Sequence, residues 1–84
     1  MIYTLHLEKK VSRQIEHFPK EMIGRIVTAL DRLRDDPRCL GVKKLTGRDG
    51  YRFRVGDYRI LYLVNDAKCE ISVYAILHRK DVYR

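Results

Sequence analysis

Apolar and polar residues alternate along 51–55 and along 58–60, two stretches that flank the dipeptide Gly56-Asp57, and the second stretch continues with the apolar residues 61–63. Such alternation is typical of strands that bury one face. Glycine accepts the positive φ that the first central position of a type II′ turn requires. The pattern therefore predicts an antiparallel β-hairpin with a two-residue loop.

The predicted hairpin has one apolar face and one basic face. With a two-residue loop, Arg54 lies opposite Arg59 and Phe53 lies opposite Ile60. The apolar face then consists of Tyr51, Phe53, Val55, Tyr58, Ile60 and Tyr62. The other face carries Arg52, Arg54 and Arg59, together with Leu61 and Leu63. We expect both leucines to stay uncovered unless a partner protein covers them.

Upstream of the hairpin, the spacing of apolar residues changes to that of helices. Residues 2–7 alternate loosely and predict a first strand, whereas 8–18 place Val11, Ile15 and Phe18 at helical spacing. Residues 20–35 predict a second, longer helix, which Pro37 ends. Its apolar stripe consists of Met22, Ile23, Ile26, Val27, Leu30 and Leu33. The two helices should form a hairpin with a shared apolar side.

The remaining segments complete a small sheet. Glycines and charges in 38–49 predict a loop, and 64–68 predict a second turn. Residues 69–77 predict a last strand with one face made of Ile71, Val73, Ala75 and Leu77, and the other of Ser72, Tyr74 and Ile76. The expected fold is a single α+β domain over residues 1–84, of order β-α-α-β-β-β. Its helical hairpin packs on one face of a small, mainly antiparallel sheet.

Composition excludes several classes of protein. A chain of 84 residues supports one hydrophobic core. No apolar run approaches the roughly 20 residues that span a bilayer, and the N-terminus lacks the charge order of a signal peptide, so we expect a soluble, cytoplasmic protein without membrane association. Cys39 and Cys69 stand apart from each other and from histidines, which predicts two buried thiols and neither a metal site nor another cofactor.

The net charge of +7 is distributed unevenly along the chain. Residues 1–37 hold 7 Lys and Arg against 6 Asp and Glu, whereas residues 38–84 hold 11 against 5. Like charges on neighbouring strands destabilise a sheet, so an anion would relieve the repulsion among the hairpin arginines. The planar guanidinium fork matches phosphate oxygens. A solvated outer face of the sheet is the alternative explanation.

The hairpin and the C-terminal tail together resemble a known family. The segments Lys44-Leu45, Gly50-Tyr51-Arg52-x-Arg54-Val55-Gly56-Asp57-Tyr58-Arg59-Ile60-x-Tyr62 and His78-Arg79-x-Asp81-Val82-Tyr83, in which x marks a position outside the match, are similar to those of RelE toxins of type II toxin–antitoxin systems, in the RelE/ParE superfamily. The resemblance implies an endoribonuclease that cleaves messenger RNA in the ribosomal decoding site. It also implies a cognate RelB-like antitoxin, which would cover Leu61 and Leu63, and the ribosome with its mRNA as the target.

The resemblance also implies the residues of the active site. Arg52 and Arg54 match the two basic strand residues of the family, Arg59 matches the arginine of the neighbouring strand, and Arg79 and Tyr83 match the tail arginine and tyrosine. The first pair is lysine in the best-known branch. Further RNA contacts are expected from the other basic residues of this half, Lys43, Lys44, Arg48, Lys80 and Arg84.

The resemblance does not identify the general base that would accept the proton in RNA cleavage. Arginine stays protonated, since its pKa lies above about 12. The unperturbed pKa of histidine, about 6.5, suits proton transfer at neutral pH, so His78 is either an acid–base catalyst or a structural residue. Tyr83 is expected to stack on a nucleobase, with proton transfer as the second choice.

Two other functions stay open at this point. One is a ParE-like toxin that inhibits DNA gyrase by binding, without catalysis. The other is a basic RNA-binding domain without enzymatic activity. The tail favours cleavage, because a toxin that only binds would not need a tyrosine five residues beyond His78 together with Arg79 and three sheet arginines.

Overall fold

The computed structural model describes residues 2–82 and forms one sheet with a helical layer. Its elements in chain order are β1 (Thr4–Leu7), α1 (Lys9–Glu16), α2 (Lys20–Asp35), β2 (Val42–Lys44), β3 (Tyr51–Val55), β4 (Tyr58–Asn65), β5 (Glu70–His78) and α3 (Arg79–Val82). The predicted α+β class is confirmed, with two short additions, β2 and α3.

The five strands form a single sheet in the order β1-β5-β4-β3-β2. Only β1 runs parallel to its neighbour, β5, so the sheet is mainly antiparallel as predicted. The central hairpin has the predicted register, with Arg54 opposite Arg59 and Phe53 opposite Ile60. Gly56 has a φ of 58°, as its turn position requires.

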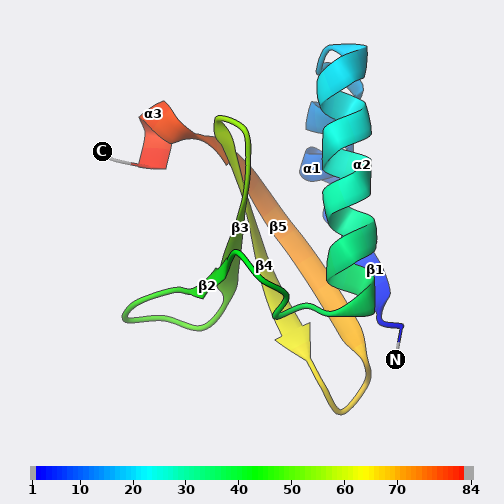
Figure 1. The fold of residues 1–84 in the computed structure, drawn as a ribbon, viewed down its shortest axis with the longest axis vertical. Coiled ribbons are helices and arrows are strands. Elements are labelled where there is room, and N and C mark those ends of the chain that lie inside the picture. The colour runs from blue at the N-terminus through cyan, green and yellow to red at the C-terminus, as the bar shows by residue number, and fades with distance from the viewer. Residues whose placement is uncertain (1, 83–84) are drawn as a thin grey trace.

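Helices α1 and α2 both lie on one face of the sheet, which leaves the other face open (Figure 1). Helix α2 ends at Asp35, where the sequence places its end, whereas α1 ends at Glu16, before Phe18. Side chains of both helices meet the apolar face of the hairpin in a core of Val11, Ile26, Ala29, Leu30, Leu33, Phe53, Val55, Ile60, Tyr62, Ile71, Val73 and Ile76. Within residues 2–82, no helix is long and apolar enough to cross a membrane.

Strand β2 corrects the prediction of a loop over 38–49. Val42, Lys43 and Lys44 pair antiparallel with Phe53, Arg52 and Tyr51 of β3. A three-residue strand is too short to show an alternation of its own. It forms because the outer edge of β3 offers unpaired backbone groups.

A β-bulge in β5 corrects the predicted faces of that strand. Leu61 of β4 lies opposite Ala75, but the next residue, Tyr62, lies opposite Val73, so Tyr74 is the extra residue. Beyond the bulge the alternation reverses: Ile76 joins the core at 3% exposure, and Leu77 lies beside Arg59 on the open face. The predicted faces are wrong from Ala75 onward, because one inserted residue reverses every later side chain.

The expectation of two uncovered leucines is also wrong for one of them. Leu61 is only 8% exposed, whereas Leu63 is 43% exposed. Leu61 lies on the central strand between Arg52 and Ala75, whose side chains share its face. Leu63 lies beside Gly50, and Gly50 has no side chain that could cover Leu63.

Candidate functional site

The three hairpin arginines come together on the open face of the sheet, as the alternation predicts. Arg52 pairs with Lys43 of β2, and Arg54 pairs with Arg59 of β4. These four cationic side chains line a cavity of about 220 Å³ with Gly41. Strand β2 therefore adds a fourth cation to the expected group. We call this cavity the basic cavity.

The basic cavity is built to meet negative charge. Its described lining consists of cationic side chains and a glycine. Arg54 is exposed, whereas Arg52 and Arg59 are half-buried. The Nε of Arg54 donates a hydrogen bond to the Gly56 carbonyl oxygen at 3.2 Å, which orients its guanidinium near the turn. Cations held this close favour a ligand with several anionic oxygens, such as a phosphate group.

The C-terminal tail begins beside the β3–β4 turn. The Arg79 backbone N–H donates to the Asp57 carbonyl oxygen at 2.7 Å, and its Nη1 lies 3.8 Å from Asp57 Oδ1. Both side chains are 61% exposed, so this ion pair contributes little stability and the backbone hydrogen bond anchors the tail. Figure 1 shows the single turn of α3 next to this end of the hairpin. Arg79 thus lies at the end of the hairpin that carries Arg54 and Arg59.

His78 lies on the opposite face from the basic cavity. It pairs with Tyr58, and the two rings make an edge contact with centroids 5.1 Å apart. Tyr58 in turn packs on Phe18, 4.8 Å away, so both rings belong to the helix-covered side. The Nδ1 of His78 accepts a hydrogen bond from the Lys80 backbone N–H at 3.2 Å. The structure therefore does not bring His78 together with the arginines.

The other predicted RNA-binding residues are spread over several surfaces. Lys44 pairs with Tyr51 and so faces away from Lys43. Arg48, in the loop between β2 and β3, donates a hydrogen bond to the Tyr74 hydroxyl at 2.8 Å. Lys80 is exposed on α3. Tyr83 and Arg84 lie outside the described residues.

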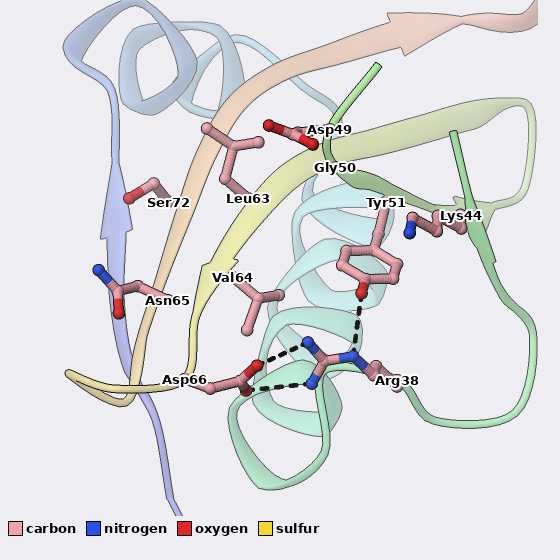
Figure 2. Close-up of a pocket in the computed structure, with 10 residues that line it drawn as sticks. All are labelled: Arg38, Lys44, Asp49, Gly50, Tyr51, Leu63, Val64, Asn65, Asp66 and Ser72. Carbon is pink, nitrogen blue, oxygen red and sulfur yellow. Dashed lines mark hydrogen bonds and ion pairs between the residues drawn. The ribbon is translucent and has the colours of Figure 1, made fainter. Parts of the chain in front are cut away.

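A second cavity, of about 560 Å³, surrounds an ion pair near the far end of β4 (Figure 2). Arg38 donates two hydrogen bonds to the Asp66 carboxylate, at 3.1 and 2.8 Å, and one to the Tyr51 hydroxyl at 3.0 Å. The Tyr3 hydroxyl also donates to Asp66, at 2.8 Å. These hydrogen bonds, chiefly those from Arg38, lower the pKa of the Asp66 carboxyl below its ordinary value. Since Arg38 and Asp66 already satisfy each other, we assign this cavity a structural role.

Metal-ligand side chains do not cluster in the part of the chain that the structure describes. Within it, no group of three His, Cys, Asp or Glu side chains could hold a metal ion. Cys39 and Cys69, expected to be buried, are half-buried.

Sequence reasoning missed two features of this surface. Ala75 and Leu77 reach the open face only because of the bulge, which no local pattern announces. Leu40, next to the basic cavity in the chain, is 92% exposed. The sequence signal that could have identified Leu40 is an apolar residue directly before a glycine in a charged loop.

Comparison with known proteins defines the class to which this fold and its basic cavity belong. The sequence model of the ParE toxin of type II toxin–antitoxin systems, parDE, matches residues 2–83. The chain therefore belongs to this family of toxins, within the RelE/ParE superfamily.

Individual relatives agree with this assignment. Toxin RelG of Mycobacterium tuberculosis H37Rv is 27% identical over 88 residues, which cover 100% of this chain and 99% of that protein. A chain of the archaeal RelE–RelB complex from Pyrococcus horikoshii OT3 has 32% identity and a TM-score of 0.85, over 94% of this chain and 97% of that one. A chain of the RelB–RelE complex from Methanococcus jannaschii has 29% identity and a TM-score of 0.72, over 93% of this chain and 94% of that one.

Proposed function

We propose that this toxin is a metal-independent endoribonuclease that cleaves translated messenger RNA on the ribosome and so inhibits translation. The observation that carries the proposal is the basic cavity, where Lys43, Arg52, Arg54 and Arg59 gather on an open sheet face. Its size and charge suit one phosphate group of an RNA chain. The similarity to RelG and to RelE chains supports the same activity.

The chemistry requires one new bond and one broken bond. The ribose 2′-oxygen attacks the adjacent phosphorus in line, and the bond from phosphorus to the 5′-oxygen breaks. The products are a 2′,3′-cyclic phosphate and a 5′-hydroxyl. Arg54, Arg59 and Arg79 stabilise the charge that develops on the phosphoryl oxygens, and removal of one such donor costs about 10²-fold to 10³-fold in rate.

Proton transfer is the step for which the basic cavity is least equipped. An arginine does not accept the 2′-hydroxyl proton, because it is always protonated. His78 contacts Tyr58 on the other face, which favours a structural role over that of a general base. We infer that the toxin binds the phosphate and relies on the ribosome to align the substrate. Free RNA should then be a poor substrate.

Contacts outside the cavity hold the RNA chain. Lys43, Lys44, Arg48, Lys80 and Arg84 supply positive charge along its path, and Tyr83 stacks on a base. Electrostatic attraction of this kind also speeds association with a polyanion as large as the ribosome.

A RelB-like antitoxin is the partner that would hold the toxin inactive. RelE is found in complex with RelB in the Pyrococcus horikoshii and Methanococcus jannaschii structures. On this chain, the exposed Leu63 and Leu40 offer apolar contacts, and the arginines require acidic side chains. We expect an acidic antitoxin with amphipathic segments that covers the basic cavity or the approach to it.

Inhibition of DNA gyrase is the second candidate function. The observation in its favour is that the matching family model is that of ParE. In that case the basic face would bind DNA gyrase without catalysis, and Arg79 would have no catalytic role.

One experiment separates the two functions. The chain is induced in a bacterium, and messenger RNA ends and gyrase supercoiling are measured within minutes in the same lysate. We expect new fragments with 5′-hydroxyl ends, confined to translated frames and absent for Arg54→Ala and Arg79→Ala. The matched control is Lys20→Ala, which removes an exposed cation from the helical layer. Intact messages with impaired supercoiling would replace the nuclease by the gyrase inhibitor.

A further inference from the structure

Tyr74 is the extra residue of the β-bulge and lies outside the core. Tyr74 and Ala75 together lie opposite Leu61, so both side chains point to the open face. Tyr3, Tyr51, Tyr58 and Tyr62 belong to the core or pack against it, whereas Tyr74 does not join that cluster. Bulges often re-aim a side chain next to an active site. The open face thus carries an aromatic ring as well as cations.

Arg48 holds this ring from the loop between β2 and β3. Its Nη2 donates to the Tyr74 hydroxyl at 2.8 Å, and its Cζ lies 5.9 Å from the ring centroid. The centroid distance is near the outer limit of about 6 Å for a cation above a ring. The guanidinium therefore contacts the hydroxyl and also lies, at the limit of this distance, over the ring. A ring that is already held in place loses little entropy on stacking.

Tyr74 lies within reach of the basic cavity. Arg52 pairs with Leu61, and Leu61 lies opposite the bulge, so one row of the sheet runs from Arg52 through Leu61 to Tyr74. Two strand spacings separate β3 from β5, which is about 10 Å. Leu61 between them is buried at 8% exposure and forms the floor. An RNA chain with one phosphate in the cavity can extend its neighbouring nucleotide along this row.

We infer that Tyr74, held by Arg48, forms a nucleobase-stacking subsite for a nucleotide next to the scissile phosphate. The inference rests on the proposed nuclease function and adds a base-recognition element to it. An unpaired base presents a π-face to an aromatic ring, and a guanidinium beside the ring adds a cation for the same base. A purely structural tyrosine would contact the core, which Tyr74 does not join.

The test is cleavage of a defined messenger on programmed ribosomes, with an abasic residue placed in turn at each nucleotide around the cut. We expect Tyr74→Leu to lower kcat/KM by about 5-fold to 100-fold on the intact messenger, the usual worth of one stacked base. An abasic residue at one position should lower kcat/KM of the native toxin by the same factor. At that position it should not lower kcat/KM of Tyr74→Leu any further. Tyr74→Phe, which keeps the ring and loses the hydroxyl, should stay within about 3-fold of the native toxin because stacking needs only the ring.

The outcomes separate this inference from the function on which it rests. The native toxin could cut the messenger while each abasic position lowers kcat/KM by the same factor for the native toxin and for Tyr74→Leu. In that case the stacking subsite is wrong and the nuclease function stands. If the native toxin leaves the messenger uncut on ribosomes, both are wrong. Urea unfolding of each variant shows whether a loss of rate reflects a loss of folded protein.

Discussion

At the scale of single residues, Asp66 joins distant parts of the chain. It accepts hydrogen bonds from Tyr3, next to the first strand, and from Arg38, just after α2. Arg38 also donates to Tyr51 on β3 (Figure 2). The three partners are far apart in sequence, so nothing in the local pattern predicts that they meet.

The lowered pKa of Asp66 predicts a pH-dependent stability. The stabilisation is fully present above the ordinary aspartate pKa of about 3.9, and it is lost as the pH falls through the lower pKa of the folded state. We expect Asp66→Asn to be less stable than the native protein at pH 7, with a smaller difference at pH 3. Urea unfolding at both values measures it. A difference for Asp66→Asn that stays constant between the two pH values would contradict the assignment.

At the scale of elements, the β2–β3 segment positions both Lys43 and Arg48. Its loop contains Gly47 and Gly50, with φ of 76° and 116°. A Cβ on Gly50 would lie 3.1 Å from the Tyr62 carbonyl oxygen and 3.3 Å from Leu63 Cδ2. A Cβ on Gly47 would meet nothing within 4 Å. A substitution at Gly47 would therefore introduce backbone strain alone, whereas one at Gly50 would introduce both backbone strain and a steric conflict with β4.

Replacing each glycine by alanine tests this distinction. We expect Gly47→Ala to cost about 1 kcal/mol, from the left-handed backbone alone. Gly50→Ala should cost about 2 to 5 kcal/mol, because strain adds to overpacking against β4. Denaturant unfolding measures both. Equal costs would mean that the approach of Gly50 to β4 does not constrain the hairpin.

At the scale of the whole molecule, charge and layer order work together. The helices cover the apolar face of the hairpin (Figure 1), so Lys43, Arg52, Arg54 and Arg59 remain on the open side. The net charge of +7 therefore favours association with a polyanion through one face.

Salt dependence of RNA binding tests that arrangement. In fluorescence anisotropy with a short single-stranded RNA, the affinity should fall as salt rises from 50 to 200 mM, because phosphate contacts release counterions. Arg52→Ala should reduce the slope of log K against log salt by about 0.7, one contact's worth for a single strand. Lys20→Ala removes the same charge from α2 and should leave the slope unchanged. Equal changes in both variants would indicate a diffuse charge effect without a binding face.

The sequence by itself determined the class of fold, the helix boundary at Asp35, the hairpin register and the gathering of Arg52, Arg54 and Arg59. These follow from local periodicity and turn chemistry. Only the tertiary structure decided that β2 pairs with β3, that a bulge turns Leu77 to the open face and His78 away from it, and that Leu61 is buried. Each depends on which strand lies alongside, and an inserted residue or an available sheet edge leaves no periodic trace in the chain.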